Sequence, residues 1–511
     1  LANALLDMYV KCGMLAKAQK VFEDLRVRDA ICWNALIAGY TEQGEADEAI
    51  KCYKQMQSEG VSPNVVTFIC ILKACGSIRA ADKGEEVHKE IESSSLLEAD
   101  ISVGNALVDM YSRCGLLAKA EEVLNGLVVR DVVSWNALLT GYVQEGHAEE
   151  ALCCFDKMQR EGLSPDVVTL ICILKACCSI GAMDKGKRIH NEIVNRGLLE
   201  RDAVLGNALV DMYAKCGLHS KARRVLEELP IQDSGSWNAL IASYARQGQG
   251  HEALHCYEQM QRKGLCPDVI TFICILKAFG STGAIDKAKQ IHSEIVHRGL
   301  LENHIVLGNA LIDMYAKFGM LGKAREVLKG LPARDAVSWN ALIAGYAQQG
   351  EVHEALNCFE WMQSEGLTPD ETTLLCVLSA CSHSGLLNEA ERIFGDMHRK
   401  YSVTPNTAHY TCMVVIFGGA GYFEKAISMI KVIPSIDDPA VWVALLWACR
   451  KWGNVKLGRL IFDQAIQLDS SCSAAYVHMA NIFAAAGMQE DAKKVESMRL
   501  KFAAGKTQGD V

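Results

Sequence analysis

The chain has 511 residues, of which half are apolar and 22% are charged, and its 52 basic and 61 acidic side chains give a net charge of −9. This composition excludes a disordered chain, and the acidic balance argues against general attraction to nucleic acid, so any such contact would have to be local to one face. No apolar run approaches the length of roughly 18 residues that a membrane-spanning helix needs, so we expect no membrane partner.

Two short segments recur along the chain at intervals of 102 residues. An Asn-Ala-Leu segment that ends in Asp-Met-Tyr begins at Asn3, Asn105, Asn207 and Asn309. Trp-Asn-Ala-Leu begins at Trp33, Trp135, Trp237 and Trp339. Self-similarity of this length is typical of stacked supersecondary units and argues against a globular enzyme core.

Each period divides into three related units, represented by residues 30–64, 65–100 and 101–131, which are 35, 36 and 31 residues long. Each unit carries two amphipathic patterns with apolar residues at i, i+3, i+4 and i+7, which predict two helices. In the unit that begins at Val132, Gly146 marks the turn between them. The prolines that precede new units are also 102 residues apart, and they are Pro63, Pro165, Pro267 and Pro369.

These patterns predict an all-α fold, a right-handed α-solenoid of stacked helix–turn–helix repeats like that of tetratricopeptide proteins. We expect the first helix of each unit to line the inner surface and the second to form the outer wall. Residues 1–438 form about thirteen units, the first incomplete, and residues 439–511 read as two further helix pairs without the Trp-Asn signature. The last stretch, 503–511, is polar and is expected to be loose.

The 21 cysteines raise the alternative of a secreted disulfide framework. One repeat position holds Cys12, Cys114 and Cys216, and a second holds Cys75, Cys177 and Cys381. In one copy of each, phenylalanine takes the place of cysteine. A thiol that exchanges with phenylalanine acts as a buried apolar group, so we predict core packing in a reducing compartment. The chain begins in the middle of a unit, so the lack of a visible targeting segment is uninformative.

Two further features narrow the repeat class. An asparagine is fifth in most of the 35- and 31-residue units, and an aspartate or asparagine closes each of them. With these features the chain closely resembles the pentatricopeptide repeat family, specifically its plant organellar branch with alternating standard, long and short motifs. Residues 336–346 resemble the standard motif and residues 378–386 the final long motif. Residues 441–450 and 475–483 resemble the two extension motifs of RNA-editing factors, whereas the deaminase domain of that branch is not found.

The resemblance implies that each unit reads one base of single-stranded RNA. The fifth residue would contact the base edge, and the closing residue would orient its amide. Seven pairs imply uracil, Asn34 with Asn64 leans to cytosine, and Thr411 with Asp438 implies guanine. The uracil pairs are Asn3 with Asp29, Asn105 with Asp131, Asn136 with Asp166, Asn207 with Asp233, Asn238 with Asp268, Asn309 with Asp335, and Asn340 with Asp370. The long units have Ile69, Ile171, Ile273 and Leu375 in that place and are expected to be unread spacers.

Simpler roles remain open for these residues. Each asparagine could merely cap a helix. The apolar second residues Ile31, Val133 and Val337 are expected to sandwich bases or to pack between repeats, and Gly235 departs from this pattern. Basic residues on first helices would contact phosphates or form a solvated face. They are Lys11, Arg113, Lys215, Lys317, Lys73, Lys175 and Lys277.

Motifs of enzyme chemistry are weak. His88, His190 and His292 each begin a His-x-Glu segment, but they recur at 102 residues and no Cys-x-x-Cys follows, so we assign them to the repeat pattern. We therefore expect no catalytic activity, no metal and no small-molecule cofactor.

The predicted function is that of a sequence-specific RNA-binding protein of mitochondria or chloroplasts. It would bind pyrimidine-rich RNA as a specificity factor for cytidine-to-uridine editing. A deaminase or accessory protein would be recruited in trans, with residues 439–511 as its docking region. Trp442, Trp447, Trp452 and Tyr476 would be anchors there, although burial is the preferred interpretation. The alternatives are a scaffold that holds a peptide in the same groove, and a factor for RNA stability or splicing.

Overall fold

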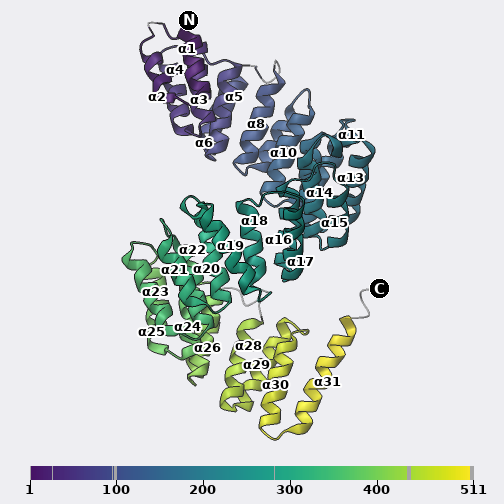
Figure 1. Cartoon of the computed structure of the whole chain (residues 1–511), viewed down its shortest axis with the longest axis vertical. Helices are drawn as coiled ribbons and strands as arrows, with labels where there is room; N and C mark the ends of the chain where they lie inside the picture. The colour runs from purple at the N-terminus through teal and green to yellow at the C-terminus, as the bar shows by residue number, and fades with distance from the viewer. Residues whose placement is uncertain are drawn as a thin grey trace. The chain divides into compact units, whose positions relative to one another are not determined.

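A computed structural model describes residues 2–25, 27–94, 96, 100–280, 282–433 and 439–506 (Figure 1). The chain forms two compact units, residues 1–244 and 245–511. Helices are the only regular elements in the described part of the chain, and they follow one another in antiparallel pairs. This confirms the predicted all-α solenoid. None of the described helices is long and apolar enough to cross a membrane.

In the N-terminal unit the helices are α1 (Ala2–Lys11), α2 (Leu15–Glu23), α3 (Ala30–Glu42), α4 (Ala46–Ser58), α5 (Val65–Ser77), α6 (Ala81–Ser93), α8 (Ile101–Arg113), α9 (Leu117–Gly126), α10 (Val132–Gln144), α11 (Ala148–Arg160), α12 (Val167–Ser179), α13 (Met183–Asn195), η1 (Leu198–Glu200), α14 (Ala203–Lys215) and α15 (His219–Glu228). Helix α16 (Ser234–Arg246) ends at the boundary between the units.

In the C-terminal unit the helices are α17 (Gly250–Arg262), α18 (Val269–Phe279), α19 (Ile285–His297), η2 (Leu300–Glu302), α20 (Ile305–Lys317), α21 (Leu321–Gly330), α22 (Ala336–Gln348), α23 (Val352–Ser364), α24 (Glu371–Ser384), α25 (Leu387–Arg399), α26 (Thr407–Gly419), α27 (Phe423–Val432), α28 (Ala440–Trp452), α29 (Val455–Leu468), α30 (Ser473–Ala485) and α31 (Gln489–Lys506). Among the last four helices, α28 contacts α29 and α30 contacts α31.

Within each compact unit, a first helix packs against its own second helix and against the first helices of its neighbours. Helix α8, for example, contacts α9, α5 and α10, and α22 contacts α23, α20 and α24. The predicted turns are in place, since Gly146 has a φ of +83° between α10 and α11. The first helices thus form one continuous layer in each unit, and this layer carries the expected base-reading residues.

Seven of the first helices begin at capping boxes, and they are α5, α10, α12, α18, α22, α24 and α26. The Asp131 side chain accepts the Ser134 N–H at 2.8 Å, and the Ser134 hydroxyl lies 3.0 Å from the Asp131 N–H. A box of this kind satisfies two backbone donors that the first helical turn leaves open. The residue that closes one unit is therefore also the N-cap of the next first helix.

A glycine near the start of α8, α14 and α20 lies under a buried leucine. A Cβ on Gly308 would lie 2.5 Å from Leu331 Cδ2, and Leu331 is only 3% exposed. We expect Gly308→Ala to lower the free energy of unfolding by about 1–3 kcal/mol because the packed leucine has to move. Gly322→Ala is the control, since nothing lies within 4 Å of its Cβ, and it should gain up to about 1 kcal/mol. Urea unfolding measures both, and equal effects would contradict the packing argument.

The three His-x-Glu histidines contact tyrosines of the following unit. Their Nδ1 atoms lie 2.9, 2.9 and 2.8 Å from the hydroxyls of Tyr111, Tyr213 and Tyr315. Burial lowers the pKa of each histidine below its ordinary value. The assignment of these histidines to the repeat pattern thus has a physical basis, because each imidazole hydrogen-bonds a tyrosine of the next short unit.

These pKa shifts predict that stability falls in mild acid. An unfolded histidine takes up a proton near pH 6.5, whereas the folded one resists it, so stability is retained above about pH 6.5 and lost below it. Urea midpoints at about pH 7.5 and 5.5 should show this drop. A variant with Gln in place of His88, His190 and His292 should show a smaller drop, and an unchanged drop would assign the acid sensitivity elsewhere.

All 21 cysteines are free thiols, but only part of the burial prediction holds. Cys75, Cys177 and Cys381 are fully buried, and burial raises the pKa of each to about 11. The prediction was wrong for the other position, where Cys12 is exposed and Cys114 and Cys216 are half-buried. That position is the C-cap of a first helix, where the chain turns toward solvent.

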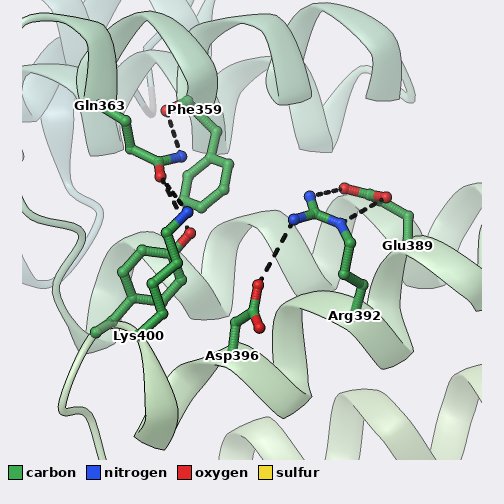
Figure 2. A network of polar contacts seen from close by, with 7 residues as sticks. Phe359, Gln363, Glu389, Arg392, Asp396 and Lys400 are labelled. Atoms are coloured by element: carbon green, nitrogen blue, oxygen red, sulfur yellow. Dashed lines mark hydrogen bonds and ion pairs between the residues drawn. The ribbon is translucent and has the colours of Figure 1, made fainter.

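Polar contacts join α23 to the segment that follows α25, the next second helix. Gln363 of α23 accepts hydrogen bonds from the Lys400 ammonium at 3.2 Å and the Tyr401 hydroxyl at 3.1 Å, both directly after α25 (Figure 2). On α25 itself, Arg392 pairs with Glu389 and lies 3.6 Å from Asp396. Exposed pairs contribute little stability each, so the buried first-helix layer dominates.

Candidate nucleic-acid interface

The expected base-reading asparagines lie inside first helices, and their closing partners lie at the start of the next first helix. Asn136 is within α10, whereas Asp166 is the N-cap of α12 and accepts the Thr169 N–H at 2.8 Å. The alternative that the asparagines merely cap helices is therefore wrong, because the closing aspartates do the capping. One carboxylate serves both the helix start and the amide of the previous unit.

Hydrogen bonds of 2.9–3.2 Å join the amide to its partner in six of the predicted pairs. Each asparagine Nδ2 donates to a side-chain oxygen of its partner. The shortest distances are 2.9 Å for Asn34 to Asn64, 3.2 Å for Asn105 to Asp131, 3.0 Å for Asn136 to Asp166, 3.1 Å for Asn207 to Asp233, 3.2 Å for Asn309 to Asp335 and 3.1 Å for Asn340 to Asp370.

The other three pairs are described by different contacts. Asn3 hydrogen-bonds Asp29 and accepts the Cys32 thiol at 3.1 Å. Asn238 is buried, and Asp268 caps α18. The Thr411 hydroxyl donates to the Thr407 carbonyl of its own helix at 2.8 Å. Its predicted partner Asp438 lies outside the described residues.

Hydrogen bonds hold two of the closing carboxylates, Asp370 and Asp29, in their charged form. Burial opposes ionisation of Asp370, but hydrogen bonds from Thr373 and Asn340 lower its pKa overall. The Cys32 backbone N–H does the same for the pKa of Asp29, with a smaller contribution from Asn3. A charged acceptor fixes the amide nitrogen of the reader toward the protein, and the amide keeps further hydrogen-bonding capacity for a base.

Hydroxyl groups that the sequence interpretation missed also hold the amides. Thr67, Thr169 and Ser338 donate to the amide oxygens of Asn34, Asn136 and Asn309 at 2.6, 2.7 and 2.6 Å. All three hydroxyl residues are fully buried. The sequence could have revealed them, because a serine or threonine is the third residue of the helix that follows most of the readers. These residues are at 67, 134, 169, 236, 271, 338 and 373.

Three amide oxygens have an unmet hydrogen-bonding capacity. The Oδ1 atoms of Asn105, Asn207 and Asn340 are buried and accept no hydrogen bond from the described protein atoms. Buried polar atoms nearly always have a partner, so an open acceptor on a binding surface is a place for a ligand donor. Asn340 is only 7% exposed, so a ligand edge that reaches this amide must enter between first helices.

A groove of about 600 Å³ runs over the first helices α5, α8, α10 and α12. Its lining includes two predicted readers, Asn105 and Asn136, together with Asp166. The spacer Ile69 lines the same groove, as does Lys73. In this part of the chain the structure therefore brings consecutive readers and a basic side chain to one surface.

Branched apolar side chains form an exposed row beside the readers. Ile31, Val133 and Val337 are 63%, 58% and 55% exposed, so the interpretation as buried inter-repeat packing is wrong. Sequence reasoning named only the standard units, but the row continues into the long and short units. Its further members are Val66, Val168, Val204, Ile270 and Val306. Each is the second residue of its unit, and this shared position could have identified them from the sequence.

Gly235 interrupts this row. A Cβ there would lie 2.8 Å from the Asn207 Nδ2, so the Asn207 amide lies where a side chain at 235 would begin. Asn207 bonds a single oxygen of Asp233, whereas Asn105 bonds both oxygens of Asp131. A side chain at 235 would therefore reposition the neighbouring reader.

The basic residues fall into two groups. Lys11, Arg113, Lys215 and Lys317 form i, i+4 ion pairs of 2.7–2.8 Å with an aspartate of the same helix. No ion pair to Lys73, Lys175 or Lys277 is found among the described residues, and all three are exposed. An unpaired ammonium is the better phosphate contact, so the second group is the stronger candidate.

Sequence comparison assigns these repeats to a known family. Models described as the PPR repeat family match residues 28–77, 130–179, 232–281 and 334–383, and models of the PPR repeat match residues 2–29, 105–132, 207–230, 309–334 and 372–401. A mitochondrial pentatricopeptide repeat-containing protein of Arabidopsis thaliana is 32% identical over 97% of this chain and 72% of its own length. A chloroplastic one from the same plant is 34% identical over 99% of this chain and 62% of its own length.

A solved structure shares the fold. The pentatricopeptide repeat protein PPR10, crystallised in complex with an 18-nt psaJ RNA element, aligns over 98% of this chain and 84% of its own. The TM-score is 0.65 and the sequence identity 17%. With the family matches covering more than half of its residues, the chain belongs to the pentatricopeptide repeat family.

Proposed function

We propose that the chain binds single-stranded RNA in a sequence-specific manner, one base for each reading unit. The observation that carries this is the row of clamped asparagines, of which Asn105, Asn207 and Asn340 have buried amide oxygens that accept nothing from the described residues. The uracil edge presents an N–H donor beside carbonyl acceptors, and an amide offers the complementary acceptor and N–H. The structure of PPR10 in complex with an RNA element supports the same ligand class.

The proposed site follows from the pairs in chain order. With uracil for each Asn–Asp pair, cytosine for Asn34 with Asn64, guanine for Thr411 with Asp438 and an unread base for each long unit, the sequence is 5′-UCNUUNUUNUUNG-3′. Asn64 supports the cytosine assignment because its amide adds a donor where the other pairs have a carboxylate.

We further propose that this RNA is an organellar transcript and that binding selects a cytidine for editing. Relatives named mitochondrial and chloroplastic support an organelle without choosing between the two. The cycle of 35, 36 and 31 residues over residues 1–438 supports membership of the family branch that alternates standard, long and short motifs. In this proposal, residues 439–511 are the extension motifs of that branch. A deaminase would act in trans on a cytidine downstream of the base bound by Thr411.

Binding of the proposed oligonucleotide to the purified chain tests the RNA function. We expect affinity for this sequence to exceed that for its purine-substituted counterpart. A peptide-holding scaffold would bind neither, and that result would overturn the proposal. Pull-down and sequencing of organellar RNA would then identify the transcript, and loss of one edited site in a loss-of-function plant would support the editing role over stability or splicing.

The unpaired lysines predict how binding depends on salt. Each phosphate contact contributes about 0.7 to the slope of log affinity against log salt for single strands. Replacing Lys73, Lys175 and Lys277 with glutamine should therefore reduce the slope by about 2. The control replaces Lys54, Lys89 and Lys289, which are exposed on second helices, and should leave the slope nearly unchanged. Equal reductions would show that only net charge matters.

A further inference from the structure

Two tryptophans of helix α28 are exposed, contrary to the preference for burial. Trp447 is 37% and Trp452 53% exposed, whereas Tyr476 of the same C-terminal region is 1% exposed. Exposed large aromatic side chains that lie close together usually mark a binding surface. These two therefore need an explanation that helix packing does not give.

The rings are held in place by the preceding first helix. The Trp452 indole N–H donates to the Gly418 carbonyl at 3.0 Å, and the Lys451 ammonium donates to the Gly419 carbonyl at 2.8 Å. A Cβ on Gly419 would lie 3.5 Å from the Trp447 ring. The glycines at the end of α26 thus leave room for two large rings and fix their orientation.

A cation lies between the rings. The Lys451 Nζ is 5.7 Å from the centroid of Trp447 and 5.7 Å from that of Trp452, within cation–π range. Neither α26 nor α28 contains an acidic residue, and Arg450 beside Lys451 is also exposed. The two helices that carry and hold the rings are therefore basic in a protein whose net charge is −9.

The position of Trp447 on its helix is that of the groove-lining side chains. In the N-terminal unit Lys73, Asp109 and Thr140 line the groove, and each lies six residues before the residue with positive φ that follows its helix. Trp447 lies six residues before Gly453, which has a φ of +64°. The ring is thus on the side of its first helix that carries the proposed RNA-binding surface.

We propose that Trp447, Lys451 and Trp452 form a stacking site for a nucleobase of single-stranded RNA, beyond the base read by Thr411. This inference rests on the proposed function and adds to it a contact that is independent of base identity. Indole faces stack on any base and an ammonium binds the adjacent phosphate, which is the combination that single-strand binding surfaces use. Val443, which takes the place of the reader in α28, cannot hydrogen-bond a base, so this unit would hold the strand without reading it.

Oligonucleotides of three lengths test the site. One is the proposed 13-nucleotide site, the second carries four extra uridines at its 3′ end, and the third carries them at its 5′ end. We expect the 3′ extension to tighten binding about 5- to 100-fold, and the 5′ extension to have no such effect. Trp447→Ala should abolish that gain while leaving the affinity for the short oligonucleotide unchanged. Trp361→Ala is the matched control, because Trp361 is 38% exposed on the second helix α23 and should retain the gain.

A second measurement needs no variant. A 3′ extension of four abasic nucleotides keeps the phosphates but offers no base, and it should lose most of the gain if stacking is responsible. Equal affinity of the short and extended oligonucleotides, or an equal gain in Trp447→Ala, would overturn the stacking site and leave the rings to a protein partner. Failure of both oligonucleotides to bind would instead overturn the proposed function itself.

Discussion

Replacing Asn136 with threonine should change the preferred base at one position of the site from uracil to guanine. The Asn136 amide is clamped by two bonds of 3.0 and 3.1 Å to Asp166, and its oxygen accepts the Thr169 hydroxyl at 2.7 Å. A carbonyl oxygen has two lone pairs, so one of them and an N–H are left for a base. A threonine hydroxyl is shorter, which leaves room for a purine, and it can accept from the N–H groups of guanine. We expect the variant to bind the original RNA about 10- to 100-fold more weakly, a difference of about 1–3 kcal/mol, and to recover on RNA with guanine there.

The fold should tolerate this substitution. Thr169 would lose the Asn136 oxygen but keep its bond of 2.9 Å to Asp166, so its hydroxyl is not left unpaired. Affinities for four oligonucleotides, each with a different base at the position read by Asn136, distinguish a change in base preference from a loss of folding. An equal loss for every base would show that Asn136 only holds the helices together. Asn340→Thr, with guanine placed at its own position instead, is the control for position dependence.

The repeat period alone was sufficient to predict the fold. The spacing of 102 residues placed Gly146 and Asp131 at turn and boundary positions, and both occupy them. Local signals of this kind are reliable because each unit contacts mainly its neighbours, so that a pattern within about 35 residues determines a helix pair. The pairing of Asn136 with Asp166 was implied by the resemblance to the repeat family, and it joins adjacent units.

The details of the site depended on side-chain contacts that the period does not encode. Thr169 was recognisable as a helix-start residue, but its bond to Asn136 depends on how closely α10 and α12 pack. Arg113 was grouped with Lys73 because both lie on first helices, yet Asp109 one turn earlier pairs with Arg113. The exposure of Trp447 depends on glycines in another helix. Each of these follows from contacts of one side chain with one neighbour.

Exchanging the closing residues of two units should exchange their base preferences in opposite directions. Asn34 donates to the amide oxygen of Asn64, whereas Asn136 donates to the carboxylate of Asp166. Asn64→Asp gives Asn34 a charged partner and removes a donor, so its base should change from cytosine toward uracil by about 10-fold. Asp166→Asn should change the base at Asn136 from uracil toward cytosine by a similar factor. Both residues remain good N-caps, so helix starts are preserved.

The double variant supplies its own control, because it keeps the net charge of −9 and exchanges only the positions of one carboxylate and one amide. We expect it to prefer RNA in which cytosine and uracil are exchanged at the two matching positions, with the salt slope unchanged. Competition binding with the original and exchanged oligonucleotides measures this directly. If Asn64→Asp weakens and Asp166→Asn strengthens binding to both RNAs alike, the closing residues act only through charge. A reversal of preference between the two RNAs would instead require that each closing residue sets the donors and acceptors that its asparagine presents.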